Sequence, residues 1–123
     1  AQSILSRVLE DHPDNAQAHY GQAQVDLRRQ RPAQAEKEFL AALKIGGEQP
    51  NIYYGLARAA AMQSDDDRAL AYLTRVFAAD DPLLRLAVRN DHVLTAKERT
   101  PELRRAVERY LTFATTSKET AAD

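Results

Sequence analysis

Three histidines are the residues of this chain best suited to acid–base or metal chemistry, and their spacing supports neither. His12, His19 and His92 lie far apart and share no ligand spacing. The sequence shows no Ser-His-Asp arrangement, no His-Glu-x-x-His motif and no glycine-rich phosphate loop. Cysteine is absent, which removes thiolate nucleophiles and disulfides together. The sequence therefore predicts no catalytic residue, no metal site and no cofactor, and it favours a protein that is not an enzyme.

Two clusters of charge have a simpler explanation than ligand binding. The aspartate run 65–67 lacks the spaced acids, glycine and distal glutamate of a calcium loop. Following Ser64, it suits the positive start of a helix. Arg28, Arg29 and Arg31 could form a phosphate-binding patch, but we favour a solvated turn because the whole chain is not basic.

Composition narrows the class of protein further. The chain has 123 residues, enough for one domain, and a formal net charge of −1. A nucleic-acid-binding protein usually has a basic excess, which is missing here. No apolar run approaches the roughly 18 residues of a membrane span, and no signal peptide is visible. The compartment stays open between cytoplasm and periplasm, and the preference for arginine over lysine favours a bacterial source.

Apolar residues repeat at a fixed interval of 34 residues. Four such series keep apolar or small character: Ala1, Ala35, Ala69; Leu5, Phe39, Leu73; Val8, Ala42, Val76; and Leu9, Leu43, Phe77. Within each copy the spacing is i, i+4, i+7, i+8, which is one face of an α-helix. The pattern predicts equivalent helices near residues 1–11, 33–45 and 67–79.

We expect a second set of helices, each lying between two helices of the first set. The stripe His19, Tyr20, Ala23 and Leu27 matches the stripe Tyr53, Tyr54, Ala57 and Ala61 one interval later. Asp14 or Asn15, Ser64, Asp81 and Thr100 can cap helix starts, Pro32 suits a first turn, and Gly46-Gly47 can end a helix. The repeating unit is therefore helix–turn–helix, and the fold class is all-α.

These features resemble the tetratricopeptide repeat family. The copy NAQAHYGQAQVDLRRQRPAQAEKEFLAALKIG shows the family's aromatic pair His19-Tyr20 and its A-x-x-x-F-x-x-A pattern at Ala35, Phe39 and Ala42. The next copy shows Tyr53-Tyr54, Ala57 and Ala69. The resemblance covers about residues 1–82. It implies an α-solenoid of about two and a half repeats and a protein-interaction function.

The resemblance also divides the chain. Residues 1–15 match the second helix of a truncated repeat, 16–49 and 50–82 are full repeats, and 83–113 form a degenerate repeat with a capping helix. Within that last part, Leu103, Ala106, Val107, Tyr110 and Leu111 make an apolar stripe that can cover the exposed end of the array. Residues 114–123 lack such a stripe, and we expect them to be disordered. Because the chain begins inside a repeat, we expect it to be a piece of a longer protein.

In the family, the first helix of each repeat lines a concave face. The resemblance therefore assigns a peptide- or partner-binding site to Gln17, Tyr20, Gln24, Arg28, Tyr54, Arg58, Met62, Arg85 and Arg89. Tyrosine and arginine dominate protein interfaces, and these positions include no carboxylate. We expect the arginines to favour an acidic peptide or a C-terminal carboxylate. The alternative is that each arginine is an ordinary solvated side chain.

Two features of the resemblance leave other roles open. Gln22 and Asp26 stand where the family prefers leucine and an aromatic residue, which predicts looser packing of that helix. Ile4, Leu5, Val8 and Leu9 form an apolar stripe without a preceding helix, so we expect self-association through residues 1–11. The principal alternatives to a scaffold or adaptor are a regulatory or substrate-recruiting domain of a larger enzyme, and a component of a bacterial envelope assembly.

Overall fold

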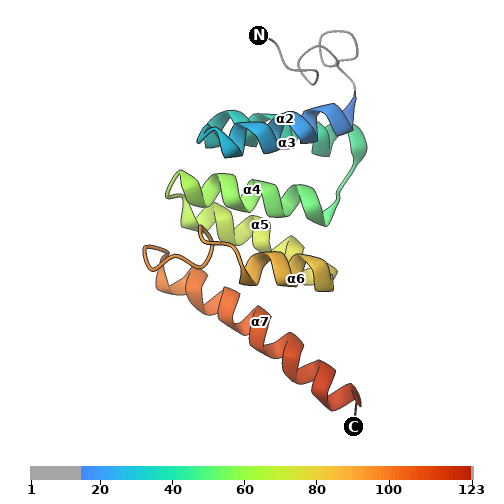
Figure 1. The fold of residues 1–123 in the computed structure, drawn as a ribbon, viewed down its shortest axis with the longest axis vertical. Coiled ribbons are helices and arrows are strands. Elements are labelled where there is room, and N and C mark those ends of the chain that lie inside the picture. The colour runs from blue at the N-terminus through green and yellow to red at the C-terminus, as the bar shows by residue number, and fades with distance from the viewer. Residues whose placement is uncertain (1–14, 123) are drawn as a thin grey trace.

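Six helices make up the described part of the chain, with no strand among residues 15–122. The computed structural model describes the backbone of residues 15–122 and the side chains of residues 15–112. The helices are α2 (Ala16–Arg28), α3 (Pro32–Gly46), α4 (Pro50–Met62), α5 (Asp66–Ala79), α6 (Pro82–Arg89) and α7 (Pro101–Ala122). Figure 1 shows them stacked as successive layers along the longest axis. The all-helical prediction is confirmed, and the expected ranges 33–45 and 67–79 agree with α3 and α5 to within one residue.

The helix starts follow the local sequence. The Asn15 side chain accepts the amide of Ala18 at the start of α2, and the Asp81 side chain accepts the amide of Leu83 at the start of α6. Pro32 lies in the first turn of α3 as predicted. Gly47, just after α3, has φ +86°, a conformation that a residue with a Cβ rarely adopts.

The two helix–turn–helix units share their turn geometry. Gln30 and Ser64 both have φ +60°, and each lies just after a helix end. The amide of Arg31 donates to the carbonyl of Asp26 at 2.8 Å, and the equivalent Asp65–Ala60 bond is 2.9 Å. These bonds are typical of a Schellman ending, in which a left-handed residue closes the helix. Ser64 therefore belongs to the turn that closes α4 and does not cap α5 as predicted. The cap of α5 is Asp65, whose side chain accepts the amide of Arg68.

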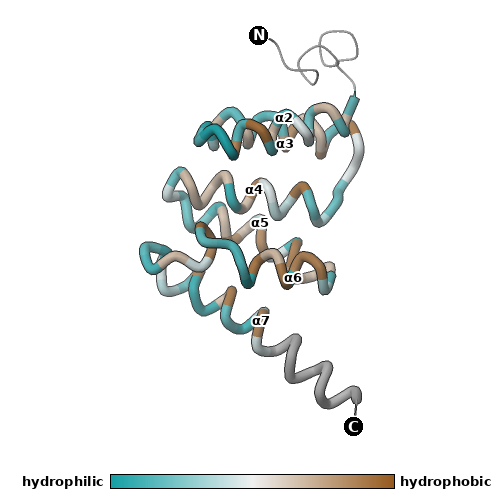
Figure 2. The backbone as a smooth tube through the Cα atoms, in the orientation of Figure 1, coloured by the Kyte–Doolittle hydropathy of each residue, from teal (hydrophilic) through white to brown (hydrophobic). Residues whose placement is uncertain are grey.

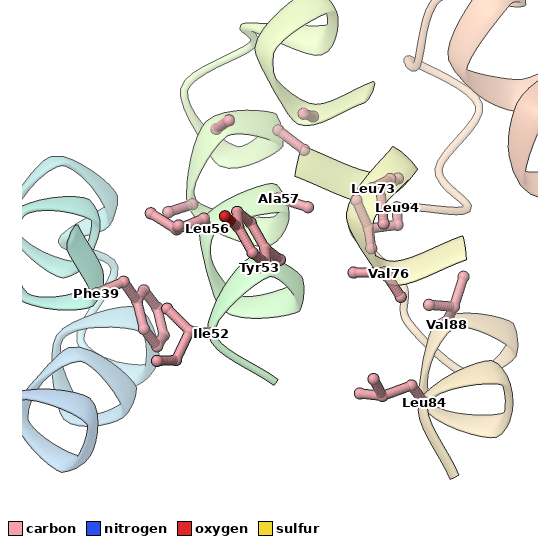
Figure 3. Close-up of a cluster of buried hydrophobic side chains, with 14 of the residues drawn as sticks. Phe39, Ile52, Tyr53, Leu56, Ala57, Leu73, Val76, Leu84, Val88 and Leu94 are labelled. Atoms are coloured by element: carbon pink, nitrogen blue, oxygen red, sulfur yellow. The ribbon is translucent and has the colours of Figure 1, made fainter. Parts of the chain in front are cut away.

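The core repeats at the predicted interval. Ala35, Phe39 and Ala42 of α3 are fully buried, as are their counterparts Ala69, Leu73 and Val76 of α5. Phe39 lies between two layers: its ring meets the Tyr20 ring edge-on at 5.7 Å, and it lies beside Ile52 of α4 in Figure 3. A Cβ at Gly55 would lie 2.3 Å from Phe39 Cζ, so the absence of a side chain at Gly55 makes room for that ring.

The C-terminal part closes the array, as the apolar stripe predicted. Leu103, Val107 and Tyr110 of α7 are buried, and the rings of Tyr110 and Phe77 lie 4.4 Å apart. The connecting segment 90–100 lies between α6 and α7, and its Leu94 packs beside Leu73 (Figure 3). Leu94 is fully buried, so this segment belongs to the core as well as linking two helices.

A buried ion pair fixes the start of α7. Arg99 Nη1 lies 3.0 Å from Asp66 Oδ1, and the amide of Thr100 donates to Asp66 Oδ2 at 2.7 Å. The hydroxyl of Thr100 then accepts the amide of Leu103 at 3.3 Å, as predicted for the cap of this helix. Asp66 therefore joins the start of α5 to the start of the final helix.

Two expectations concern the chain ends. The backbone of α7 runs to Ala122, and the expected disorder of residues 114–123 stays a prediction. Residues 114–122 contain no glycine or proline, and extending an existing helix is far easier than starting one. The truncated-repeat helix and the self-association stripe at Ile4, Leu5, Val8 and Leu9 lie outside the described residues.

Candidate protein-binding face

The first helices of successive layers form one candidate face of the molecule. Figure 1 shows α2, α4 and α6 in this order along the stack, and side chains of α4 contact α6 directly. We call the exposed and half-buried side chains of these three helices the A-helix face. It contains eight of the nine predicted binding residues: Gln17, Tyr20, Gln24, Arg28, Tyr54, Arg58, Met62 and Arg89.

Charge is distributed unevenly between the two sets of helices. Within α2, α4 and α6, the only acidic residue is Asp26, which is buried, against arginines at positions 28, 58, 85 and 89. In α3 and α5, by contrast, acidic and basic residues are equal in number. The A-helix face therefore presents cations and amides to solvent, with no exposed carboxylate belonging to its own helices.

On α2 the predicted residues differ in exposure. Gln17 and Arg28 are exposed at the two ends of the helix, whereas Tyr20 and Gln24 between them are half-buried. Tyr20 is held by its edge-on contact with Phe39. Its position is therefore fixed by the core, which lowers the entropy that binding would cost.

Tyr54 and Arg58 on α4 both contact a carboxylate that was not predicted. The hydroxyl of Tyr54 donates to Asp91 Oδ2 at 2.5 Å, and Arg58 Nε lies 2.8 Å from the same oxygen. The Arg58 Nε–H is not aimed at that oxygen, so this contact is an ion pair without a directed hydrogen bond. The nine predicted binding positions include no carboxylate, but the segment that follows α6 places Asp91 against two of them.

Both carboxylate oxygens of Asp91 have partners within the protein. Its side chain is 2 % exposed, and its other oxygen accepts the amides of Val93 and Leu94 at 2.9 and 3.0 Å. One carboxylate thus shapes the turn after α6 and ties it to α4. No sequence pattern predicts this role, because Asp91 contacts residues 33 and 37 positions earlier and lies outside the periodic pattern.

Burial raises the pKa of Tyr54 above its ordinary value, and the hydrogen bond to the Asp91 carboxylate raises it further. Both effects disfavour the phenolate. The hydroxyl therefore stays protonated and donates to Asp91 throughout the physiological range.

Arg85 is in a different place from the one predicted. It is buried, its guanidinium lies 5.3 Å from the centre of the Tyr110 ring, and it forms an ion pair with Asp80. The spacing of Arg85 and Arg89 suggested that both lie on one exposed face of α6. In the structure, Arg85 lies on the buried side of the helix and Arg89 on the exposed side. Asp80 and Tyr110 draw Arg85 toward α7, and Arg89 alone remains exposed.

Two exposed leucines on α6 were missed by sequence analysis. Leu83 and Leu86 point away from the core, while Leu84 and Val88 face Val76 of α5 (Figure 3). The available signal was the presence of four large apolar residues in the eight-residue segment PLLRLAVR, more than one face of so short a helix can bury. Met62, at the end of α4, is half-buried against the core and contributes little free surface.

The described residues give no sign of other kinds of site. Among them, no group of three or more histidines, cysteines and carboxylates is arranged to hold a metal ion. None of the helices in the same part of the chain combines the length and the apolar character needed to cross a membrane.

Comparison with known proteins identifies one family. The family model described as tetratricopeptide repeat matches residues 1–51 and again residues 22–82, which together span more than half of the chain. No curated protein and no solved structure gave a match. The first match includes α2 and α3, and the second includes α3, α4 and α5.

Proposed function

Because this chain belongs to the tetratricopeptide repeat family, whose members are generally protein-interaction modules, we propose that it binds a segment of a partner protein on the A-helix face. The observation that supports this choice of face is its charge: α2, α4 and α6 expose arginines and amides and no carboxylate of their own. In this role the protein acts as a non-catalytic scaffold or adaptor.

The proposed partner segment is acidic, or ends in a free carboxylate. Arg28 and Arg89 are exposed and form no ion pair within the described residues. Arginine presents a planar fork of donors that matches a carboxylate in a bidentate arrangement. Gln17 and Gln24 offer amides that can pair with the backbone of an extended segment.

Arg58 contributes through a fixed orientation. Asp91 Oδ2 lies 2.8 Å from the Nε of this guanidinium. The side chain keeps 32 % of its surface exposed although Nε itself is buried. A guanidinium that is oriented before binding loses less entropy when it pairs with a partner carboxylate.

The test is a comparison of two charge-reversal variants with equal changes in net charge. Arg28→Glu with Arg89→Glu alters the A-helix face, and Lys37→Glu with Lys44→Glu alters exposed positions of α3. All four side chains are exposed, so both variants should fold. Tyr54 and Arg58 are unsuitable probes because they also hold Asp91 in place.

Each protein would be immobilised and exposed to lysate of the source cells, with captured proteins quantified by mass spectrometry. We expect a partner that the unaltered protein and the α3 variant retain, and that falls at least tenfold with the A-helix variant. A partner retained by both variants, or lost only with the α3 variant, would place binding elsewhere.

A further inference from the structure

The two leucines on the outer side of α6 are unusually exposed. Among the described residues, the most exposed large apolar side chains are Leu83 at 77 %, Leu86 at 52 %, Leu40 at 43 % and Ile45 at 42 %. Leu83 and Leu86 on α6 are more exposed than Leu40 and Ile45 on α3. Both leucines lie on one helix of eight residues. Figure 2 shows most of α6 as hydrophobic although it lies at the surface.

The fold does not need these leucines for its core. Leu84 and Val88 already fill the inner side of α6, and Arg85 fills the side toward α7. Leu83 and Leu86 are three residues apart, which places them next to each other on the outer side. Arg89 follows Leu86 by the same interval and is also exposed. The result is a strip of two leucines and one arginine, which we call the Leu83–Arg89 strip.

Each carboxylate near this strip has a partner within the protein, although the Asp80 side chain stays 76 % exposed. Asp81 accepts the amide of Leu83, Asp80 pairs with Arg85, and Asp91 is enclosed by Tyr54 and Arg58. A ligand would therefore meet apolar surface and the Arg89 guanidinium, which has no ion-pair partner among residues 15–112. The chemistry that complements both is a bulky apolar side chain close to a carboxylate.

We propose that the Leu83–Arg89 strip is a docking site for a partner segment in which a bulky apolar residue is flanked by aspartate or glutamate. This inference rests on the proposed function and names the partner chemistry that this end of the A-helix face selects. The leucines contribute apolar contact, and Arg89 selects against partners that place a cation beside the apolar residue.

The same charges argue against a second copy of this chain as the occupant. A symmetric pair formed through the strip would bring two equivalent surfaces together. Each copy would bring Arg89, and the carboxylates just before α6, Asp80 and Asp81, already pair with Arg85 and with the amide of Leu83. A like-charge contact of this kind destabilises an interface, whereas an acidic segment neutralises it.

The test is selection from a random dodecapeptide library displayed on phage, followed by fluorescence anisotropy with a synthetic peptide of the enriched sequence. The variants are Leu83→Ser with Leu86→Ser, and Arg89→Glu. The matched control is Leu40→Ser with Ile45→Ser, which removes the two other exposed apolar side chains. Circular dichroism would verify helix content, which exposed substitutions should leave unchanged.

We expect enriched peptides that combine leucine, phenylalanine or tryptophan with aspartate or glutamate. Their affinity should fall at least tenfold with the serine pair on α6 and by less than twofold with the control. Arg89→Glu should shift the selection away from acidic peptides. No enrichment, enrichment of basic peptides, or equal binding to the serine pair would each overturn the proposal.

Two further results separate this inference from the proposed function and from self-association. If the native partner is lost with the Arg28→Glu and Arg89→Glu variant but retained by the serine pair, the A-helix face binds and the leucine site is wrong. If analytical ultracentrifugation finds a dimer that the serine pair dissociates, the occupant is a second copy and the proposal also fails.

Discussion

At the scale of single residues, Asp91 explains why two predicted binding residues are also structural. Tyr54 and Arg58 converge on its Oδ2, and the amides of Val93 and Leu94 occupy the other oxygen. A buried carboxylate is costly unless it is paired and hydrogen-bonded, and this one has both kinds of partner. The side chains that fix the turn after α6 therefore also fix the orientation of Arg58 on the A-helix face.

The first prediction concerns the hydroxyl of Tyr54. Tyr54→Phe should lower the free energy of unfolding at neutral pH by about 1 kcal/mol, because Asp91 loses one hydrogen bond. The raised pKa of Tyr54 means that the folded protein keeps a proton that the unfolded chain releases near pH 10. This contribution is therefore complete below pH 10 and is lost as the pH rises above 10.

Urea denaturation of both proteins between pH 7 and 11.5 is the measurement. The difference in free energy of unfolding between the two proteins should become smaller above pH 10. Burial also raises the pKa of Tyr72 and Tyr110, but both proteins share that effect. A gap that stays constant up to pH 11.5 would contradict the assigned role of the hydroxyl.

The second prediction concerns Asp26, which is buried with one carboxylate oxygen that has no hydrogen-bond partner. Its other oxygen accepts from Gln22 at 3.1 Å. The equivalent position of the next repeat is the fully buried Ala60. Asp26→Ala should therefore raise the free energy of unfolding, by about 1 kcal/mol, because it removes an incompletely satisfied buried charge.

Thermal and urea denaturation would measure that change, with Asp67→Ala on the exposed surface of α5 as the control. A loss of stability in Asp26→Ala would show that the carboxylate has a stabilising partner after all.

At the scale of helices, the fit of one layer against the next depends on Phe39 and Gly55. The ring and the glycine lie on α3 and α4, and no side chain fits between them. Fully buried aromatic rings cannot move aside without disturbing their neighbours. This contact therefore sets how closely the first helix pair approaches the second.

The third prediction is that Gly55→Ala destabilises the protein although alanine is the better helix former. The higher helix propensity of alanine would raise the free energy of unfolding by about 1 kcal/mol. A Cβ at 2.3 Å from Phe39 Cζ, however, forces repacking that costs about 1–3 kcal/mol or more. Replacing the ring as well, in Gly55→Ala with Phe39→Leu, should restore part of the loss, since leucine occupies the equivalent position 73. A double variant as unstable as the sum of the two single variants would contradict this account.

Periodicity predicted the helices well and their exceptions poorly. The 34-residue interval located α3, α5 and the buried series at Ala35, Phe39 and Ala42, because each depends on spacing within one helix. It could not locate Asp91 or the burial of Arg85, because both depend on contacts between segments outside the periodic pattern. The exposure of Leu83 likewise depends on how α6 is rotated against α5 and α7.

At the scale of the whole molecule, the near-neutral net charge conceals a separation of charge. The chain has a formal net charge of −1, yet α2, α4 and α6 contain four arginines and one buried aspartate. The acidic residues lie mainly in the second helices and the turns, where Asp66 and Glu36, for example, are held by arginines. This separation of charge is the basis for proposing an acidic partner, although the protein as a whole is not basic.

The most direct test of the central claim is mapping of the partner's contact surface by amide chemical shifts. Isotope-labelled protein would be titrated with the captured partner or with the enriched synthetic peptide, and amides would be followed along every described helix. The account predicts that the largest shifts fall in α2, α4 and α6, with small shifts in α3 and α5. Largest shifts in α3 and α5 would contradict it and would move the binding surface to the opposite side of the stack.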